Sequence, residues 1–324
     1  MFQKFKLKIS ILILFFFFSV FLSLSVGVSQ FSFQSFLSAS NQEIILQLRL
    51  PRILLGALVG IALSVSGAAF QALLRNPLAD PFILGVSGGA ALGSVLAVGL
   101  HLPFIWVSLF AFGAALLSML LIYSLAQTKG RLNPHTLLLV GVLFNTTTFA
   151  LILFINALVS MEDLHRIWFL MVGSLEAIEY SRLALVAFLV FLGLGIIFYD
   201  ASSLNLLTLG EENASLLGVE VERVRTRVFF AASLMVGAIV SVSGLIGFVG
   251  LAVPHIVRLW LGADHRLLIP STAVFGASFL VLSDFIARIA FSGENFQTQL
   301  PVGVLTALIG APLFFYLLRH ETRG

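Results

Sequence analysis

One short stretch of the sequence has the residue types and spacing of a catalytic serine. Residues 85–89 read Gly-Val-Ser-Gly-Gly, which matches the G-x-S-x-G pattern around a nucleophilic serine. His255, in an apolar stretch, could be the general base of such a serine. That pattern requires a strand before the serine, and no strand-like segment precedes Ser87. The tripeptide Val-Ser-Gly also begins at Val65 and Val242, as small-residue helix packing predicts, so we expect no catalytic residue.

Metal and nucleotide chemistry also lack support in the sequence. The chain has no cysteine, which removes thiol catalysis and cysteine-ligated metals. No metal-ligand spacing is present among the histidines at the following positions: His135, His165, His255 and His265. No G-x-x-x-x-G-K-[ST] sequence occurs, so we expect this chain to bind neither a nucleotide nor a cofactor of its own.

Three arginines are candidates for contact with something outside the membrane: Arg49, Arg52 and Arg288. An arginine at the centre of a bilayer costs about 2.5–3.5 kcal/mol on insertion scales, so we expect all three near a membrane surface. They could instead be anchors that extend to the interface. Asp284 lies four residues before Arg288, and a helical ion pair between them is a further alternative, with a strength of only a few tenths of a kcal/mol.

A short helix is predicted in the loop at about 203–225. Thr208 and Glu211 have the spacing of a capping box, so we expect the helix to start there, with Gly210 and Glu212 in its first turn. Three residues can form one apolar face before a glycine that fits a C-cap: Ala214, Leu216 and Leu217, followed by Gly218. A helix this short is not stable alone, so it needs a docking surface on its own protein or on a partner.

Two polar turns interrupt the apolar runs, Asn76-Pro77-Leu78 and Asn133-Pro134-His135. A proline after a short polar residue ends a helix and fixes a turn. Ordinary turn chemistry therefore explains both segments, and any further role for them needs another argument.

The elements that must position these residues are membrane helices. The chain is 59% hydrophobic and 10% charged, whereas soluble domains have about 25% charged residues. Its mean hydropathy of +1.08 and long apolar runs predict an all-α, polytopic membrane protein and disfavour a barrel. The formal charge of +3 is spread over short loops, which indicates membrane orientation and not a nucleic-acid surface.

About ten transmembrane helices are predicted, with the whole of residues 1–324 as a single transmembrane domain. The expected spans are 9–28, 51–74, 82–100, 104–126, 136–160, 183–199, 228–247, 248–261, 267–291 and 300–318. The eighth span is too short to cross alone, so we expect a half-helix preceded by irregular, glycine-rich backbone. The first span follows a basic N-terminus, and a signal peptide is the alternative to a retained helix.

Basic residues predict the orientation. With ten spans, both termini lie on one side of the membrane. Placing them in the cytoplasm puts 13 of the 18 lysines and arginines inside and leaves five outside: Arg49, Arg52, Arg166, Arg182 and Arg288. We therefore expect a multi-pass protein of the cytoplasmic (inner) membrane with both termini cytoplasmic. Residues 161–181, with Trp168, are expected to form an amphipathic helix at the outer interface.

An internal echo suggests a repeat. Residues 64–67 read Ser-Val-Ser-Gly and precede Pro77 by ten residues, and residues 241–244 have the same sequence and precede Pro254 by ten. If spans two to five and seven to ten are two copies, the single span between them inverts the second copy. Inverted repeats of this kind are typical of transporters.

Several long motifs resemble one family of membrane proteins. LRLPR at 48–52, SGAAFQALLRNPLADPFILGVSGG at 66–89, GFVGLAVPHIVRLWLGADHR at 247–266 and LPVGVLTALIGAP at 300–312 are similar to the membrane-spanning permease of ATP-driven (ABC) importers for iron-siderophores, haem and cobalamin. The resemblance covers essentially the whole chain. It implies a non-catalytic transport subunit that moves a metal chelate, with a ferric siderophore first and haem or cobalamin next.

The resemblance also implies partners and residue roles. A homodimer would work with two ATP-binding subunits that hold ATP and Mg, and with a soluble periplasmic or lipid-anchored substrate-binding protein. The helix near 208–218 would couple to the ATPase through Thr208, Gly210, Glu211, Glu212, Ala214, Leu216, Leu217 and Gly218. Arg49, Arg52 and Arg288 would dock the binding protein. The cytoplasmic gate would include Asn76, Leu78, Pro134 and His135, although the second turn lacks the small hydroxyl residues that the family has there.

Two other classes remain as alternatives. A secondary, ion-coupled transporter would need an acidic residue within a span, and Asp284, near the end of one, is the candidate. A rhomboid-like intramembrane serine protease would use Ser87, but the extra histidines and asparagine of those enzymes are not evident.

Overall fold

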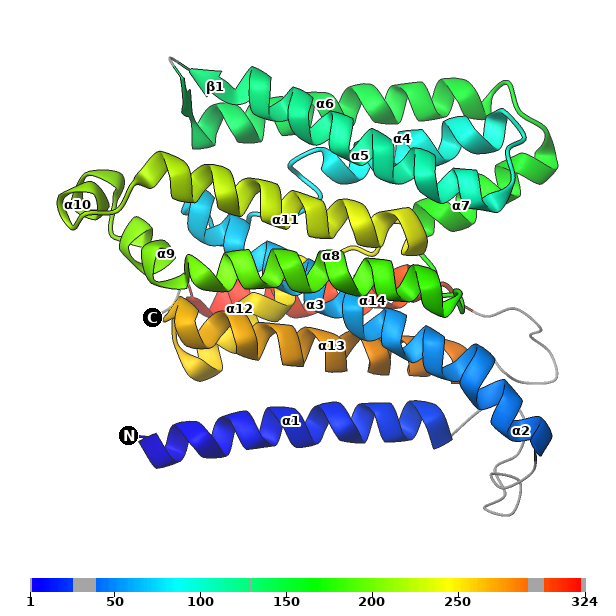
Figure 1. Ribbon diagram of the computed structural model, residues 1–324, viewed down its shortest axis with the longest axis horizontal. Coiled ribbons are helices and arrows are strands. Elements are labelled where there is room, and N and C mark those ends of the chain that lie inside the picture. The colour runs from blue at the N-terminus through cyan, green and yellow to red at the C-terminus, as the bar shows by residue number, and fades with distance from the viewer. Residues whose placement is uncertain (1, 26–38, 129, 291–299, 322–324) are drawn as a thin grey trace.

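The chain is an assembly of helices that lie side by side along the long axis of the molecule (Figure 1). The computed structural model describes residues 2–25, 39–128, 130–290 and 300–321. The start of the first helix and the end of the last one lie at the same end as α10, and α2 and α7 lie at the opposite end (Figure 1). We refer to these as the α10 end and the α7 end.

The described helices and strands have the following bounds: α1 Phe2–Ser25, α2 Ala39–Ile44, a π-helical stretch η2 Ile45–Arg49, α3 Leu50–Leu74, α4 Val86–Gly99, α5 Phe104–Ala126, α6 Pro134–Asn156, α7 Met161–Val172, α8 Tyr180–Tyr199, α9 Ala201–Thr208, α10 Glu211–Leu216, α11 Val221–Ser243, α12 Val249–Leu261, α13 His265–Ile289 and α14 Val302–Glu321, with strands β1 Gln127–Thr128 and β2 Arg131–Leu132. The two strands form an antiparallel hairpin in which Gln127 is opposite Leu132.

The predicted spans correspond to described helices. Seven helices are long and apolar enough to cross a membrane, and three shorter apolar helices are α4, α12 and the segment Val302–Phe315 of α14. Together they match the ten expected spans in order. The ends of the first and ninth expected spans, at 26–28 and 291, lie outside the described residues. The all-helical polytopic fold is confirmed.

Helix α3 forms the centre of the assembly, and it does so because its small residues permit close packing. In the most apolar stretch of 18 residues within Gln42–Leu74, 89% of the residues are buried. A Cβ atom on Gly60 would overlap the backbone carbonyl of Gly276 in α13, and one on Gly67 would overlap the carbonyl of Gly250 in α12. Only glycine permits helix backbones to approach this closely, as the small residues of this stretch predict.

The predicted half-helix is also confirmed. α12 has 13 residues and follows the irregular segment 244–248, in which Gly244 and Phe248 have φ values of 68° and 67°. Neighbouring backbone bonds to this segment: the Leu245 amide donates to the Leu170 carbonyl (3.3 Å) and the Ser174 amide donates to the Ser243 carbonyl (2.9 Å). Non-helical backbone within a membrane requires such internal partners.

The helix order supports a repeat, but the tetrapeptide echo does not. α3 to α6 have 25, 14, 23 and 23 residues, and α11 to α14 have 23, 13, 25 and 20, so the second helix of each group is the short one. α3 and α11 run in opposite directions (Figure 1). Residues 64–67, however, lie within α3, whereas residues 241–244 span the end of α11. The two tetrapeptides are therefore not structurally equivalent.

The amphipathic helix predicted at 161–181 is shorter than expected. α7 ends at Val172 because Gly173 has a φ of 76° and turns the chain into an extended linker before α8. Its start is fixed by the Ser160 hydroxyl, which accepts the Asp163 amide (3.2 Å). Trp168 is half exposed on α7, as the prediction of an interfacial helix requires.

Candidate functional site

The α9–α10 segment protrudes at the α10 end of the molecule (Figure 1). The predicted capping box is wrong, because Thr208 ends α9 and its hydroxyl donates to the Asn205 carbonyl (2.6 Å). α10 instead follows Gly210, which has a φ of 113°, and no side chain caps it. Gly218 has a φ of 85° directly after the last helical turn, which confirms the predicted helix end.

The short helix has two different faces. Ala214 is fully buried, whereas Leu216 and Leu217 are 81% and 63% exposed. The prediction that these three residues form one apolar face is therefore wrong. Positions 214 and 216 lie about 200° apart around a helix, and α10 ends before Leu217. Leu209, which lies between α9 and α10, is also 63% exposed. Large exposed apolar side chains that cluster beyond the spans mark an interaction surface.

A network of charged residues joins α10 to its neighbours. Arg225 of α11 has a side chain that is 5% exposed, and its Nη2 atom lies 2.5 Å from Glu211 Oε1 in α10. Its Nη1 atom donates to the Leu132 carbonyl of β2 (3.0 Å) and lies 3.8 Å from Glu222 Oε2. Glu222 Oε1 accepts the Leu132 amide (2.6 Å). Arg75, at the end of α3, lies 3.3 Å from the same Glu211 oxygen.

The two predicted turns lie directly beside this network. Asn76 follows Arg75, and its Oδ1 atom accepts the Leu78 amide (2.9 Å). Asn133 follows Leu132, and its Oδ1 atom accepts the His135 and Thr136 amides (2.9 and 3.3 Å). Pro134 is the first residue of α6, where a missing amide hydrogen costs nothing. The structure thus brings both turns, with exposed Leu78 and His135, to the same end as α10.

The turn after α3 also holds a perturbed carboxyl group. Burial raises the pKa of Asp80 from 3.8 to about 6, although the Phe82 amide, which donates to Asp80 Oδ1 (2.7 Å), favours the charged form. The carboxyl group is therefore partly protonated near neutral pH. Sequence reasoning did not select Asp80, and its position between two prolines was the available signal.

Asn145 of α6 holds the irregular backbone that precedes α4. Its Nδ2 atom donates to the carbonyls of Phe82 and Ile83 (2.8 and 3.2 Å), so α4 starts at Val86 and not at 82 as predicted. A cavity of about 300 Å³ lies here between α4, α6 and residues 245–247, lined in part by Ser87 and Thr148. Asn145 was missed by sequence reasoning, although an amide within an apolar span was a usable signal.

The G-x-S-x-G geometry of a catalytic serine is not present. A turn, and not a strand, precedes Ser87, which is 2% exposed and donates to the Phe82 carbonyl (3.3 Å). His255 lies within α12, and its ring packs edge-on against Phe314, with 5.8 Å between the ring centroids. Ser87 therefore has the surroundings of a small helix-packing residue.

The three predicted docking arginines cluster around α1, α3 and α13, and two of them share one carboxylate. Asp284 is almost fully buried; its oxygens contact Arg52 Nη2 (2.8 Å) and Nε (3.1 Å), and Oδ2 also lies 3.1 Å from Arg288 Nε. The predicted ion pair between Asp284 and Arg288 is thus confirmed. Arg288 also donates to Ser23 of α1 (2.5 Å). Arg49 donates to the Leu24 carbonyl (2.9 Å).

This clustering limits what the arginines can do. The side chains of Arg52 and Arg288 are 18% and 11% exposed, and both already pair with Asp284. An acidic partner would have to compete with Asp284 for them. Asp284 in turn is held between two cations, which is unsuited to reversible binding of a coupling ion.

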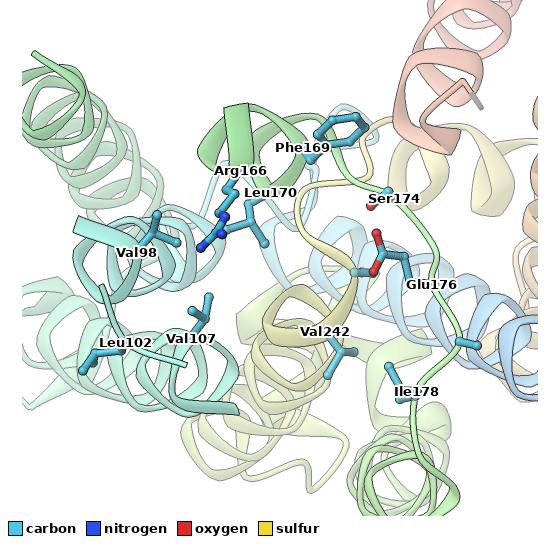
Figure 2. A pocket seen from close by; sticks show the side chains of 12 residues that line it. Val98, Leu102, Val107, Arg166, Phe169, Leu170, Ser174, Glu176, Ile178 and Val242 are labelled. Carbon is cyan, nitrogen blue, oxygen red and sulfur yellow. The ribbon is translucent and has the colours of Figure 1, made fainter. Parts of the chain in front are cut away.

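A second cavity, of about 470 Å³, lies at the α7 end. Figure 2 shows Arg166 of α7 on one side, near Val98 and Val107, and Glu176 of the linker after α7 across the cavity. The rest of the lining is mostly apolar and comes from α4, α5, α7, the linker and the end of α11. Since α6 does not line it, this cavity is separate from the one beside Asn145. Sequence reasoning had no signal for it, because its walls come from distant segments.

The fold is that of a multi-pass helical membrane protein. The FecCD transport family matches residues 11–320, and the chain belongs to this family of permease subunits of ABC importers for metal chelates, cobalamin or haem. It is 42% identical over 281 residues to a cobalamin import system permease of Halobacterium salinarum, covering 86% of this chain and 74% of that protein. It is 37% identical over 306 residues to a hemin transport system permease of Yersinia pestis, covering 91% of this chain and 90% of that protein.

A solved structure has the same fold. It is described as an inward-facing conformation of an ABC transporter of the metal-chelate type, and it matches with a TM-score of 0.87 and 32% identity. The match covers 95% of this chain and 97% of the other. The helix arrangement described above is therefore that of a metal-chelate type ABC transporter chain.

Proposed function

We propose that the chain is the permease subunit of an ATP-driven importer that moves a metal chelate across the cytoplasmic membrane. The observation that carries this proposal is α10, a six-residue helix that buries Ala214 and exposes Leu216 and Leu217 at the α10 end. Such a helix offers an apolar contact to a partner. The family membership indicates that this partner is an ATP-binding subunit.

The proposed assembly contains two copies of this chain, two ATP-binding subunits and one soluble periplasmic or lipid-anchored binding protein. ATP and Mg are held by the ATP-binding subunits, and this chain itself is not an enzyme and binds no cofactor. Closure of the ATPases would push on α10 and move the spans between outward-open and inward-open states. The distribution of basic residues favours a cytoplasmic α10 end with both termini there.

Residue roles follow from this assembly. Residues 208–218 contact the ATPase, with Leu216 and Leu217 as apolar contacts and Glu211 as the link to the rest of the chain. The turns at 76–78 and 133–135 form the cytoplasmic gate. Arg49, Arg52 and Arg288 dock the binding protein, with Arg49 meeting the partner first, since Asp284 already holds the other two.

The proposed substrate is a ferric siderophore, with haem or cobalamin as the next candidates. Relatives named for cobalamin and hemin support a bulky metal chelate as the class. The cavity between α4 and α6 has neutral polar groups, including Asn145 and Thr148. Neutral lining fits a path that passes on a preformed chelate without binding it tightly.

The test is purification of the tagged chain from its host in mild detergent, with mass spectrometry of co-purifying proteins. A double variant, E211R together with L217R, serves as the comparison, and R223M changes an exposed arginine nearby. We expect a stoichiometric ATPase with the wild type and R223M and its loss from the double variant. Uptake of radiolabelled ferric siderophore, haem and cobalamin by proteoliposomes containing the purified complex then identifies the substrate. A wild-type chain that brings no ATPase contradicts the proposal.

A further inference from the structure

Arg225 has a buried, charged side chain. It lies in the first turns of α11, and its side chain is 5% exposed. A buried guanidinium is unfavourable unless it is paired and hydrogen-bonded. Here its partners come from separate segments: Glu211 from α10 (2.5 Å), Glu222 from α11 (3.8 Å) and the Leu132 carbonyl from β2 (3.0 Å).

These contacts fix Leu132 at both of its backbone polar groups. Arg225 holds the carbonyl, and Glu222 holds the amide at 2.6 Å. The next three residues are the turn Asn133-Pro134-His135, from which α6 starts. A shift of Arg225 along α11 must therefore displace the start of α6 or break hydrogen bonds of a fully buried residue.

The connection between α10 and the turn at 76–78 is exposed to solvent. Arg75 precedes Asn76 and reaches the same oxygen of Glu211 at 3.3 Å, but the side chains of Arg75 and Glu211 are 45% and 43% exposed. An exposed ion pair contributes little and can exchange with water. The turn at 133–135 is thus tied to α10 through a buried side chain, Arg225, whereas the turn at 76–78 is tied to it through an exposed one, Arg75.

We propose that Arg225 is a positioning residue that transmits displacement of α10 to the turn at 133–135. This inference rests on the proposed function, in which an ATPase pushes on α10. Separating Glu211 from Arg225 would leave a buried cation without its nearest anion, which is strongly unfavourable. The pair therefore moves together, and Arg225 carries the Leu132 carbonyl with it.

The simpler alternative is that Arg225 only stabilises the fold. A matched control exists on the same helix: Arg223 pairs with Glu220 at 2.6 Å, both side chains are largely exposed, and within the described part of the chain this pair does not join a second segment. If Arg225 transmits movement through Leu132, R225M must differ from R223M in chelate uptake per ATP and not only in melting temperature.

The experiment uses the complete complex with its ATPase and binding protein in proteoliposomes. Because the chain has no cysteine, H135C or L78C introduces a unique site for an environment-sensitive fluorophore in each turn. The readouts are ATP hydrolysis, chelate uptake per ATP hydrolysed, and the ATP-dependent fluorescence change at each turn. R225M, R225K, R223M and E211Q are compared with the wild type.

We expect R225M to keep ATPase binding and hydrolysis but to reduce uptake per ATP about tenfold, within the usual range of coupling between sites. The ATP response at position 135 is expected to vanish and that at position 78 to remain. R225K should recover part of the coupling, since lysine keeps the charge but lacks the fork that holds Glu211 and Leu132 together. R223M should match the wild type.

Parallel loss of hydrolysis and uptake with an unchanged ratio, or equal responses at positions 78 and 135, would overturn the inference. If R225M fails to fold, E211Q tests the same link from its exposed side and must give the same selective loss at position 135. A wild-type complex that binds no ATPase would refute the proposed function itself, and this result is distinct from an ATPase-bound complex in which R225M couples normally.

Discussion

The exposed leucines of α10 allow a quantitative prediction for the ATPase contact. Replacing leucine by alanine removes three carbon atoms, and burial of each stabilises by about 0.8 kcal/mol. Leu216 and Leu217 are 81% and 63% exposed, so full coverage by a partner would bury most of both side chains. Scaled by these fractions, the losses in L216A and L217A are about 2 and about 1.5 kcal/mol, together about 3.5 kcal/mol.

A loss of this size corresponds to an increase of about 300-fold in the Kd for the ATPase. Incomplete coverage lowers the figure, and about 30-fold is the smallest change that the reasoning allows. The assay is surface plasmon resonance or thermophoresis with the purified permease in detergent and the isolated ATPase. The control is L185A on α8, a leucine that is 60% exposed along a membrane-spanning helix and should leave the Kd unchanged. A change below about 30-fold in L216A/L217A would refute α10 as the ATPase contact.

Three further predictions concern stability and pH. D284N leaves two mostly covered arginines without their carboxylate, so it should lower the free energy of unfolding by about 3–5 kcal/mol and lower the melting temperature in detergent. The control variant S283A should not lower it. Equal melting temperatures of the two variants would contradict a stabilising role for the pairing of Asp284 with Arg52 and Arg288. G67V places a side chain against the α12 backbone and should abolish the folded monodisperse peak in size-exclusion chromatography, whereas G113A, with open space around it, should not; a normal G67V peak would show that the α3–α12 contact is not required. Because burial raises the pKa of Asp80 to about 6 in the folded chain, folding is favoured below the unfolded value of 3.8 and loses stability as pH rises through about 6. D80N should therefore melt above the wild type at pH 8 and match it at pH 3.5, and a pH-independent difference would contradict the assignment.

The sequence predicted those parts of the fold that depend on local apolar patterns. Each long apolar run became a helix, and the short run before residue 261 became a half-helix because its glycine-rich start cannot continue a regular helix. The close approach of Gly60 and Gly67 to neighbouring backbone also followed from residue size alone.

The errors arose where one local signal competed with another. Thr208 and Glu211 have capping-box spacing, but the Thr208 hydroxyl is already used inside α9, so the box cannot form. Residues 161–181 have an amphipathic pattern throughout, yet the positive φ of Gly173 ends the helix at Val172. The prediction of a single apolar face was wrong because positions 214 and 216 lie about 200° apart around a helix and because α10 ends before Leu217.

The functional residues that sequence reasoning missed depend on partners that are distant in the chain. In the sequence, Arg225 is one of several basic residues in a loop, and only the structure shows that it donates to the Leu132 carbonyl. Asn145 resembled a tolerated polar residue in a span until the broken backbone at Phe82 reached it. Neither contact has a local pattern, so only tertiary structure could identify them.

The irregular backbone at the α7 end has a consequence for the order in which the molecule is assembled. The Gly303 amide donates to the Gly173 carbonyl (3.1 Å), and a Cβ on Gly303 would overlap the Val172 carbonyl. Gly303 is synthesised long after Gly173. The Gly173 carbonyl therefore has this hydrogen-bond partner only after the beginning of α14 has been made. Until then, the linker after α7 has its backbone hydrogen bond to Ser243 and the packing of Leu175. Completion of this part of the membrane domain is thus a late event during biogenesis, and insertion of α14 acts as its closing step.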